Sequence, residues 1–296
     1  MYHVVFNPVA GGRKALKNLA VLERIFQERE VEYAVHESLS CGDITKIVRS
    51  LTRKEDNEII VLGGDGTLHE ALNGIEDPTA CRLGLVPSGT GNDFAERLGI
   101  PMQAEKAVEL ILKGETKETD YLEVGGKRCM NVAGLGMDVE VLELCNRGKM
   151  KGKLKYLYSL LKCLFAYKGC RIVLKSEGRE EPHSVLLAAV CNGSLFGGGI
   201  KVCPTADVAD GKLDVVVVDC IVSVWKIVKA FMVLLKGGIL EYPLTTHYLC
   251  EEVSFIPETP CSVQLDGEIY NDLQFDVKIK TGLKFYPAKS RTRLSN

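Results

Sequence analysis

The sequence predicts a protein of two domains, an α/β domain followed by an antiparallel β-sandwich domain. Two observations lead to this fold class. Strand-like and helical segments alternate over residues 1–122, whereas strand-like runs dominate residues 123–286. A chain of 296 residues also has room for two cores of ordinary size. We take residues 114–120 as the connection between the two domains.

In the first domain, short apolar runs alternate with segments whose apolar residues recur at helical spacing. The predicted strands are residues 4–6, 31–35, 59–62 and 83–86. The helical segments between and after them begin near residues 16, 44, 68, 94 and 107. Strands that alternate with helices in this way form a parallel sheet that is covered on both faces, which gives three layers.

The second domain consists mainly of predicted strands, with two helical segments at residues 154–167 and 222–235. Short strands that are separated by Gly and Pro are typical of an antiparallel sandwich. The predicted strands are residues 121–124, 171–174, 184–190, 213–219, 253–256, 262–265 and 275–279.

Composition argues against several classes of function. Lys and Arg total 37 against 39 for Asp and Glu, and a formal net charge of −2 gives no reason to expect a nucleic-acid partner. The 11 cysteines and five histidines show neither zinc-ligand, disulfide nor catalytic-triad spacing. We expect most of the thiols to be small buried side chains in a cytoplasmic protein.

Neither the N-terminus nor the most apolar stretch of the chain has the pattern of a targeting or membrane segment. Residues 1–8 lack the basic start and long apolar stretch of a signal peptide and predict a first strand. Residues 221–240 are the most apolar stretch, but Lys226, Lys229 and Lys236 recur within it. A spanning helix requires roughly 20 residues with few charges, so we expect no transmembrane helix here.

Three polar, glycine-containing loops follow predicted strands of the first domain, where ligands bind in open parallel sheets. In residues 63–67, Gly-Gly-Asp-Gly-Thr, the glycines let the backbone approach an anion and the next helix offers its N-terminus. Asp65 suggests that a metal or a ribose hydroxyl is also present. We therefore expect this loop to bind nucleotide phosphate.

The other two loops are residues 7–12 and 87–94. The first is not a Walker A loop, and a tight strand-to-helix turn is the alternative interpretation. The second combines glycines and hydroxyls with Asn92 and Asp93, which are able to cap the next helix. For Asp93, helix capping is the alternative to a role in organising a metal.

These blocks together resemble the diacylglycerol kinase catalytic-domain family, and in particular its soluble bacterial lipid kinases related to sphingosine and ceramide kinases. The loop that starts at Gly63 is shared with NAD kinases, whereas the six blocks in order are highly specific. They are Asn7-Pro8 with Gly11-Gly12, residues 63–73, 89–95, 131–138, 204–214 and 266–268.

The resemblance implies an NAD-kinase-like three-layer α/β nucleotide domain and a β-sandwich lipid-binding domain, with the nucleotide in the cleft between them. Residues 287–296 would return to the first domain. ATP would be held by Asn7, Ser38, Gly63, Gly64, Asp65, Gly66, Thr67, Gly89 and Thr90. Asp65 and Glu268 are the implied catalytic residues, with Glu268 as the general base that accepts the lipid hydroxyl proton.

The resemblance also implies Mg²⁺, which keeps several of its waters when it binds protein. Asp93, Asp120 and Asp210 would organise magnesium through waters. In the turn 207–212, the Asp210 carboxylate and the carbonyls of Asp207 and Lys212 would bind a structural metal. From the residues alone, an Asp-Gly hairpin is the preferred interpretation of that turn, and a hairpin is also the alternative for Glu268.

A lipid substrate requires apolar surface and contact with a membrane. The helical segment 154–165 is amphipathic and lies among lysines 149, 151, 153, 155, 162 and 168, so it could rest on an anionic bilayer. A helix that covers the core, with solvated lysines, explains the pattern equally well, and the same two interpretations apply to residues 221–240. Residues 289–293 could attract phosphate or form a solvated tail.

The function that these features favour is Mg²⁺-dependent transfer of the γ-phosphoryl group of ATP to a lipid hydroxyl, with diacylglycerol first among substrates. The expected location is the cytoplasm, with peripheral membrane association. An NAD kinase and a non-catalytic lipid-binding protein are the alternatives. A homodimer is a hypothesis without a supporting sequence feature.

Overall fold

The computed structural model describes residues 1–54, 57–147, 153–167, 169–220 and 223–286. The chain divides into two compact units. Among the described residues, the first unit contains Met1–Thr119 together with residues 281–286, and the second contains Asp120–Lys280. Residues 281–286 therefore belong to the first unit, whereas the predicted return of residues 287–296 lies outside the described residues.

The first unit is built on a parallel sheet in the order β4-β3-β1-β2. The last residues of β17 (Phe275–Phe285) add to its β4 edge, also in parallel. Every predicted strand of this domain is present. The bounds are β1 Tyr2–Phe6, β2 Tyr33–Glu37, β3 Glu58–Gly63 and β4 Arg82–Pro87.

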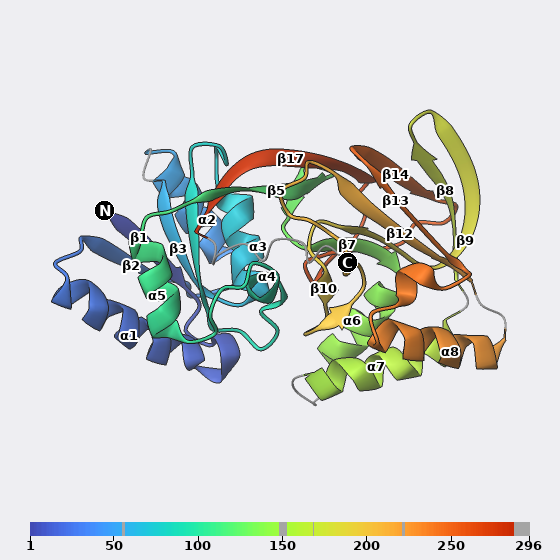
Figure 1. Cartoon of the computed structure of the whole chain (residues 1–296), viewed down its shortest axis with the longest axis horizontal. Coiled ribbons are helices and arrows are strands. Elements are labelled where there is room, and N and C mark those ends of the chain that lie inside the picture. Colours follow the sequence, from blue (N-terminus) through green and yellow to red (C-terminus); the bar gives the residue numbers. More distant parts are fainter. Residues whose placement is uncertain (55–56, 148–152, 168, 221–222, 287–296) are drawn as a thin grey trace, which may run out of the picture. The chain divides into compact units, whose positions relative to one another are not determined.

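Helices cover both faces of this sheet, as predicted (Figure 1). α1 (Lys14–Glu28) packs beside α5 (Ala104–Leu112), and α2 (Asp43–Thr52) packs beside α3 (Asp65–Gly74). A short helix, α4 (Asp93–Arg97), follows β4. The apolar residues of β1 and β3 are fully buried because both faces are covered, which explains their continuous apolar runs.

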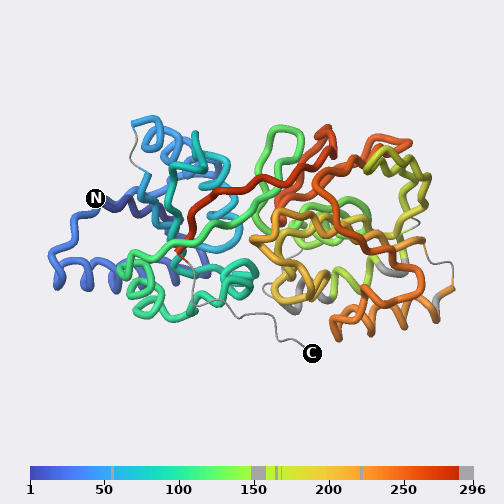
Figure 2. The backbone as a smooth tube through the Cα atoms, turned by 45° about the horizontal axis from the view of Figure 1, so that its top comes forward, coloured from blue at the N-terminus to red at the C-terminus, as the bar shows by residue number. Residues whose placement is uncertain are grey.

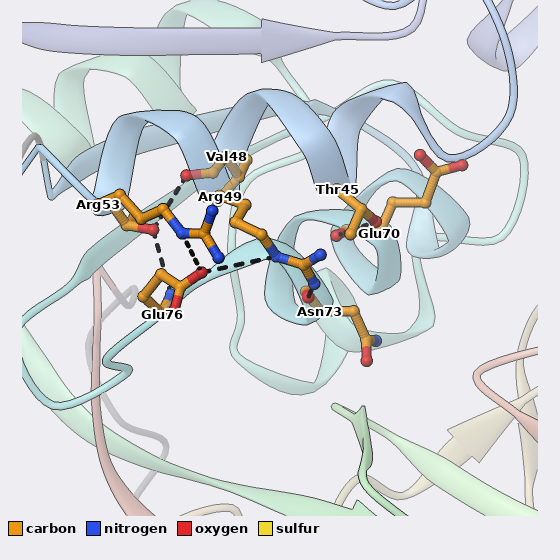
Figure 3. A network of polar contacts seen from close by, with 8 residues as sticks. Thr45, Val48, Arg49, Arg53, Glu70, Asn73 and Glu76 are labelled. Carbon is orange, nitrogen blue, oxygen red and sulfur yellow. Dashed lines mark hydrogen bonds and ion pairs between the residues drawn. The ribbon is translucent and has the colours of Figure 1, made fainter.

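Polar contacts hold α2 against α3 (Figure 3). The Thr45 hydroxyl donates to the Glu70 carbonyl at 2.8 Å, and the Arg53 Nε lies 2.9 Å from Glu76 Oε1. Arg49 donates to the Asn73 carbonyl at 3.3 Å. These contacts fix the helix whose first turn contains Asp65, Gly66 and Thr67.

The strands of the first unit end at the same edge of the sheet. Phe6 is opposite both Glu37 of β2 and Leu62 of β3, and Gly63 is opposite Pro87 of β4. The segments that follow these four strands therefore emerge side by side. This register brings together the three loops that the sequence singled out.

The second unit consists mainly of antiparallel pairs, including β7 with β9, β8 with β9 and β12 with β13. The bounds are β5 Lys117–Val124, β6 Lys127–Cys129, β7 Val132–Gly136, β8 Cys170–Ser176, β9 Arg179–Cys191, β10 Leu195–Phe196, β11 Ile200–Lys201, β12 Leu213–Asp219, β13 Thr245–Cys250, β14 Glu252–Pro257, β15 Val263–Leu265 and β16 Glu268–Tyr270. Strands β5 and β17 pair with each other and carry the chain between the units (Figure 2).

Two cores lie on opposite sides of the central strands of this unit. In β12, Leu213, Val215 and Val217 face the interior of the sandwich, whereas Val216 and Val218 face a core that is covered by helices. Both faces are buried, so the strand is an unbroken apolar run rather than an alternating one. The predicted β-sandwich is confirmed, with helices added on one face.

Three helices cover that face: α6 (Met137–Arg147), α7 (Lys153–Ala166) and α8 (Val224–Leu235). The sequence predicted the last two and not α6, whose first residues were recognised only as a motif. Leu160 and Cys163 of α7 and Phe231 and Leu234 of α8 are buried in the core, so both helices do cover it. No helix within the described residues is long and apolar enough to cross a membrane.

Candidate functional site

The two glycine-rich loops of the first unit are in backbone contact. A Cβ atom built on Gly89 would lie 2.5 Å from the Gly64 Cα, and one built on Gly64 would lie 2.8 Å from the Gly89 Cα. Real Cβ atoms do not approach other atoms so closely, so both positions require glycine. The Gly63–Thr67 and Gly89–Asp93 segments therefore form one continuous backbone surface.

Asp65 ties these loops together through its carboxylate. Its Oδ2 accepts a hydrogen bond from the Asn92 amide at 2.8 Å, and its Oδ1 accepts one from the Phe94 amide at 3.3 Å. A carboxylate at a helix N-terminus is favourable because it satisfies free N–H groups and the helix dipole. Asp65 thus has two backbone partners that the sequence, which suggested a metal or a ribose hydroxyl, did not reveal.

The alternative interpretation, in which this Asn-Asp pair caps α4 through its side chains, does not hold at Asn92. Asn92 has the N-cap position in a left-handed conformation (φ 58°) and makes no side-chain cap bond. Its side-chain oxygen instead accepts from the Gly89 N–H at 2.9 Å, and its side-chain nitrogen donates to the Gly89 carbonyl at 3.0 Å. These two bonds close the Gly89–Asn92 loop. Asp93 is buried, with 5% of its surface exposed.

The first loop adds a third segment at the same edge. Asn7 closes a tight turn, since its carbonyl accepts from the Ala10 amide at 3.1 Å and its side chain accepts from the Val9 amide at 3.1 Å. Gly11 lies against the Ser88 carbonyl, where a Cβ atom would overlap it, and its φ of 56° favours glycine. The loop 7–12 is therefore a tight strand-to-helix turn, and it also lies against the loop that contains Ser88.

The remaining predicted nucleotide residues lie close to these loops. Ser38 is buried, and its amide donates to the Phe6 carbonyl at 3.0 Å, which places it beside the end of β1. Gly63 packs against the Thr67 side chain, and Gly66 and Thr67 lie in the first turn of α3. Thr90 is exposed. All the predicted nucleotide-binding residues therefore lie at one sheet edge, beside the free amides of a helix N-terminus.

In the second unit, Asp120 is joined to the turn 207–212. Its Oδ2 accepts from the Gly211 amide at 2.8 Å, and its own amide donates to the Val208 carbonyl at 2.6 Å. Within the turn, Asp210 Oδ1 accepts from the Lys212 amide at 3.0 Å. The turn is not a β-hairpin, because β11 before it pairs with β10 and β12 after it pairs with β9 and β13.

Glu268 is the first residue of β16 and follows the tight two-residue turn that joins β15 to β16. Asp266 (φ 53°) and Gly267 (φ 90°) are both left-handed, as a two-residue type I′ turn requires, and Leu265 is opposite Glu268. The Asp266 carboxylate accepts from the Met130 and Asn131 amides at 2.7 Å each. The hairpin is thus anchored, and Glu268 is exposed at its end.

Asn192 connects the two groups of the second unit, and it was not among the residues predicted from the sequence. Its side-chain amide donates to the Asp120 carbonyl at 2.8 Å and to the Met130 carbonyl at 2.7 Å. Met130 in turn donates to Asp266. The sequence feature that could have pointed to Asn192 is its position directly after the apolar run 185–191. Asn192 is fully buried in the structure. Asp120, the 207–212 turn and the Glu268 hairpin therefore belong to one hydrogen-bonded region.

Asp138 is a further acidic residue of this unit. It lies in the first turn of α6 and is buried, and this burial raises its pKa to about 7 against a smaller opposing effect of the Gln264 side chain. A carboxyl group in such surroundings is neutral at mildly acidic pH and is ionised at a cost when the pH rises.

We expect Asp138→Asn to change how stability depends on pH. The folded pKa lies above the unfolded value, so the folded state binds more protons and the free energy of unfolding falls as pH rises from about 4 to about 7. The loss approaches about 4 kcal/mol at alkaline pH. In urea unfolding, the free energy of unfolding of Asp138→Asn relative to the wild type should be higher at pH 8 than at pH 5. Asp276→Asn, at an exposed aspartate, should show no such change. An equal difference at both pH values would contradict the prediction.

Comparison with known proteins identifies the family. The diacylglycerol kinase catalytic domain matches residues 1–124, and the YegS C-terminal NAD kinase beta sandwich-like domain matches residues 131–283. The diacylglycerol kinase of Bacillus subtilis is 29% identical over 72% of each chain. A Salmonella paratyphi A protein named "Probable lipid kinase YegS" is 32% identical over 68% of this chain and 70% of its own.

The fold agrees with this assignment. A crystal structure of a diacylglycerol kinase from Bacillus anthracis superposes with a TM-score of 0.72 at 23% identity, covering 97% of both chains. A likeness at this identity supports the fold alone, whereas the two domain matches establish the relationship. The chain belongs to the diacylglycerol kinase and YegS-like family of lipid kinases.

Proposed function

We propose that this protein transfers the γ-phosphoryl group of ATP, with Mg²⁺, to a lipid hydroxyl, and that diacylglycerol is the substrate. The observation that supports this most is the fused pair of glycine loops in a chain of the lipid kinase family. Their contact and the N-terminus of α3 form a backbone surface suited to phosphate oxygens. Asn7, Ser38, Gly63–Thr67, Gly89 and Thr90 would hold the nucleotide.

Magnesium fits the chemistry of the residues around the turn 207–212. Asp120 and Asp210 supply carboxylates, and Asp207 and Lys212 supply carbonyls, which are the hard oxygen ligands that Mg²⁺ prefers. The carboxylates of Asp120 and Asp210 are oriented by the Gly211 and Lys212 amides. Asp120 and Asp210 would organise Mg²⁺ through its waters and neutralise charge on the phosphoryl group, and the Asp210 carboxylate with the carbonyls of Asp207 and Lys212 would bind a structural metal.

Glu268 would accept the proton of the lipid hydroxyl as its oxygen attacks phosphorus. An exposed carboxylate on a rigid hairpin is accessible to a substrate and keeps its position, and both properties favour a general base.

The acceptor would be reached at a membrane surface, for which α8 offers an apolar stripe. Trp225, Val228, Met232 and Leu235 are 84%, 37%, 49% and 43% exposed, and they recur at helical spacing on the side away from the buried residues. Lys226, Lys229 and Lys236 lie on the same helix or directly after it. An apolar stripe beside lysines suits the interface of an anionic bilayer.

Trp225 makes this surface measurable, because it is the only tryptophan in the chain. We expect its fluorescence to shift to the blue when vesicles with anionic lipid are added, and less so with zwitterionic vesicles or at high salt. Met232→Ser combined with Leu235→Ser should weaken vesicle binding by about tenfold or more. Leu16→Ser, an exposed leucine of α1, is the matched control. No shift with anionic vesicles would remove α8 from the proposal.

The function itself is tested by incubating the purified chain with γ-labelled ATP, Mg²⁺ and mixed micelles of diacylglycerol, sphingosine or ceramide. The proposal predicts labelled phosphatidic acid and its loss on removal of Mg²⁺. If only sphingosine or ceramide gave a labelled product, that lipid would replace diacylglycerol as the substrate in the proposal. Labelled NADP from NAD in a parallel reaction, without labelled lipid, would support the NAD kinase alternative. Binding of lipid without transfer would support a non-catalytic protein.

A further inference from the structure

A second cluster of metal-ligating side chains lies in the second unit, apart from the acidic residues of the proposed magnesium site. It consists of Cys203, Asp214 and His247, whose ligand atoms all lie within 4.8 Å of one another. No other group of three such side chains converges in this way within the described residues. Sequence spacing gave no hint of it, because the three residues come from separate segments of the chain.

The strand register explains how these residues meet. Asp214 of β12 is opposite Cys191 of β9, and His247 of β13 is opposite Val216, two residues after Asp214. Residues directly opposite in a ladder, and those two apart along a strand, point to the same face of a sheet. Asp214, His247 and Cys191 therefore share the helix-covered face, and Cys203 approaches from the loop that precedes the 207–212 turn.

The distances describe three ligand atoms around one point. His247 Nε2 lies 2.7 Å from Asp214 Oδ1, Cys203 Sγ lies 3.3 Å from the same oxygen, and Sγ lies 3.9 Å from Nε2. A catalytic triad would use both imidazole nitrogens, one for the thiol and one for the carboxylate. Here the same nitrogen faces both groups, as it does in a metal site.

We infer that Cys203, Asp214 and His247 bind a divalent transition metal, with Zn²⁺ as the best fit. Tetrahedral zinc places its S, N and O ligand atoms about 3.3–3.6 Å apart, so the Cys203–Asp214 distance already fits. The His247–Asp214 hydrogen bond must lengthen by about 0.6 Å as the metal replaces its proton. A thiolate, a carboxylate and a neutral imidazole balance the two positive charges of the ion.

The thiol of Cys191 lies on the same face of the sheet, opposite Asp214, but outside the group of three whose ligand atoms converge. Its interaction with the Cys203 thiol, together with burial, raises its pKa well above the ordinary value. Cys191, Cys203 and Asp214 are almost completely buried, whereas 24% of the His247 side chain is exposed, which leaves one side open for metal entry. The soft sulfur and imidazole ligands distinguish this site from the oxygen ligands proposed for Mg²⁺.

Such a metal would fasten β13 and the loop before the 207–212 turn to the first residues of β12. The turn ends at Lys212, two residues before Asp214, so the ion would limit motion of the segment that contains Asp210. Metal binding at these residues can be measured whether or not the protein has the proposed kinase activity.

Cobalt titration of the metal-free full-length protein is the test, because Co²⁺ takes zinc sites and is visible by absorption. One equivalent of Co²⁺ should give a thiolate-to-cobalt charge-transfer band, which Zn²⁺ displaces and a large excess of Mg²⁺ does not. Loss of a residue that only supports a metal ligand typically costs about 10–100-fold in metal affinity. Cys203→Ala and His247→Gln each remove a ligand, so each should weaken Co²⁺ affinity by more than that. Cys41→Ser, at an exposed thiol, should leave the band unchanged.

His247→Gln is the decisive variant if Cys203→Ala fails to fold, since the histidine is partly exposed. The absence of a thiolate band in the wild-type protein, an unchanged Co²⁺ affinity in His247→Gln, or displacement of the band by Mg²⁺ would each overturn the inference.

Discussion

Glu268→Gln should reduce phosphoryl transfer to the lipid by about 10²–10⁴-fold, the usual contribution of a general base. Glutamine keeps the size of the side chain and removes its ability to accept a proton. The fold should be unaffected because Glu268 is exposed and the hairpin is held by Asp266 rather than by Glu268. The measurement is kcat with saturating ATP and lipid, together with thermal unfolding of both proteins.

The pH dependence separates this role from a merely structural one. In the wild type, the rate should fall at acidic pH as the base is protonated, and that limb should disappear in Glu268→Gln. ATP affinity should remain within a few-fold of the wild type. Glu258→Gln, at an exposed acid of the same unit outside the proposed site, is the control. Full activity in Glu268→Gln would exclude the residue from the mechanism.

Periodicity predicted the fold well wherever burial is strong. The predicted strand 213–219 has the same bounds as β12, and the predicted helix 222–235 overlaps α8 almost completely. Both faces of β12 are buried, so every residue from Leu213 to Val218 except Asp214 is apolar and the strand is visible in the sequence. β13 (Thr245–Cys250) was missed because its residues are mostly polar and partly exposed, which leaves no apolar signal.

The candidate site was predictable only in part, for a related reason. Glycine loops after buried strands leave a local signature, and the register at Gly63 and Pro87 brings them together as expected. The partners of Asp65 and Asp266 are backbone amides 27 and 135 residues away in the chain, and no local pattern encodes them. The convergence of Cys203 with His247 is equally non-local.

The Asp65 carboxylate gives rise to the second large prediction, since it joins the two loops of the proposed phosphate site. Asp65→Ala removes the acceptor for the Asn92 and Phe94 amides. We expect a loss of about 1–3 kcal/mol in local stability and a decrease in phosphoryl transfer of at least about 100-fold. Hydrogen exchange at the Asn92 and Phe94 amides and kcat/KM for ATP measure the two effects.

Asp65→Asn shows whether the charge itself is needed. Asparagine keeps one oxygen that can accept an amide hydrogen bond, but it is neutral and cannot attract a metal ion. If Asp65 acts only by joining the loops, the asparagine variant should recover much of the amide protection and much of the activity. If it also acts on Mg²⁺ or the triphosphate, protection should recover while activity stays as low as in Asp65→Ala. Wild-type activity in Asp65→Ala would contradict both roles, because the loops would then need neither the hydrogen bonds nor the charge.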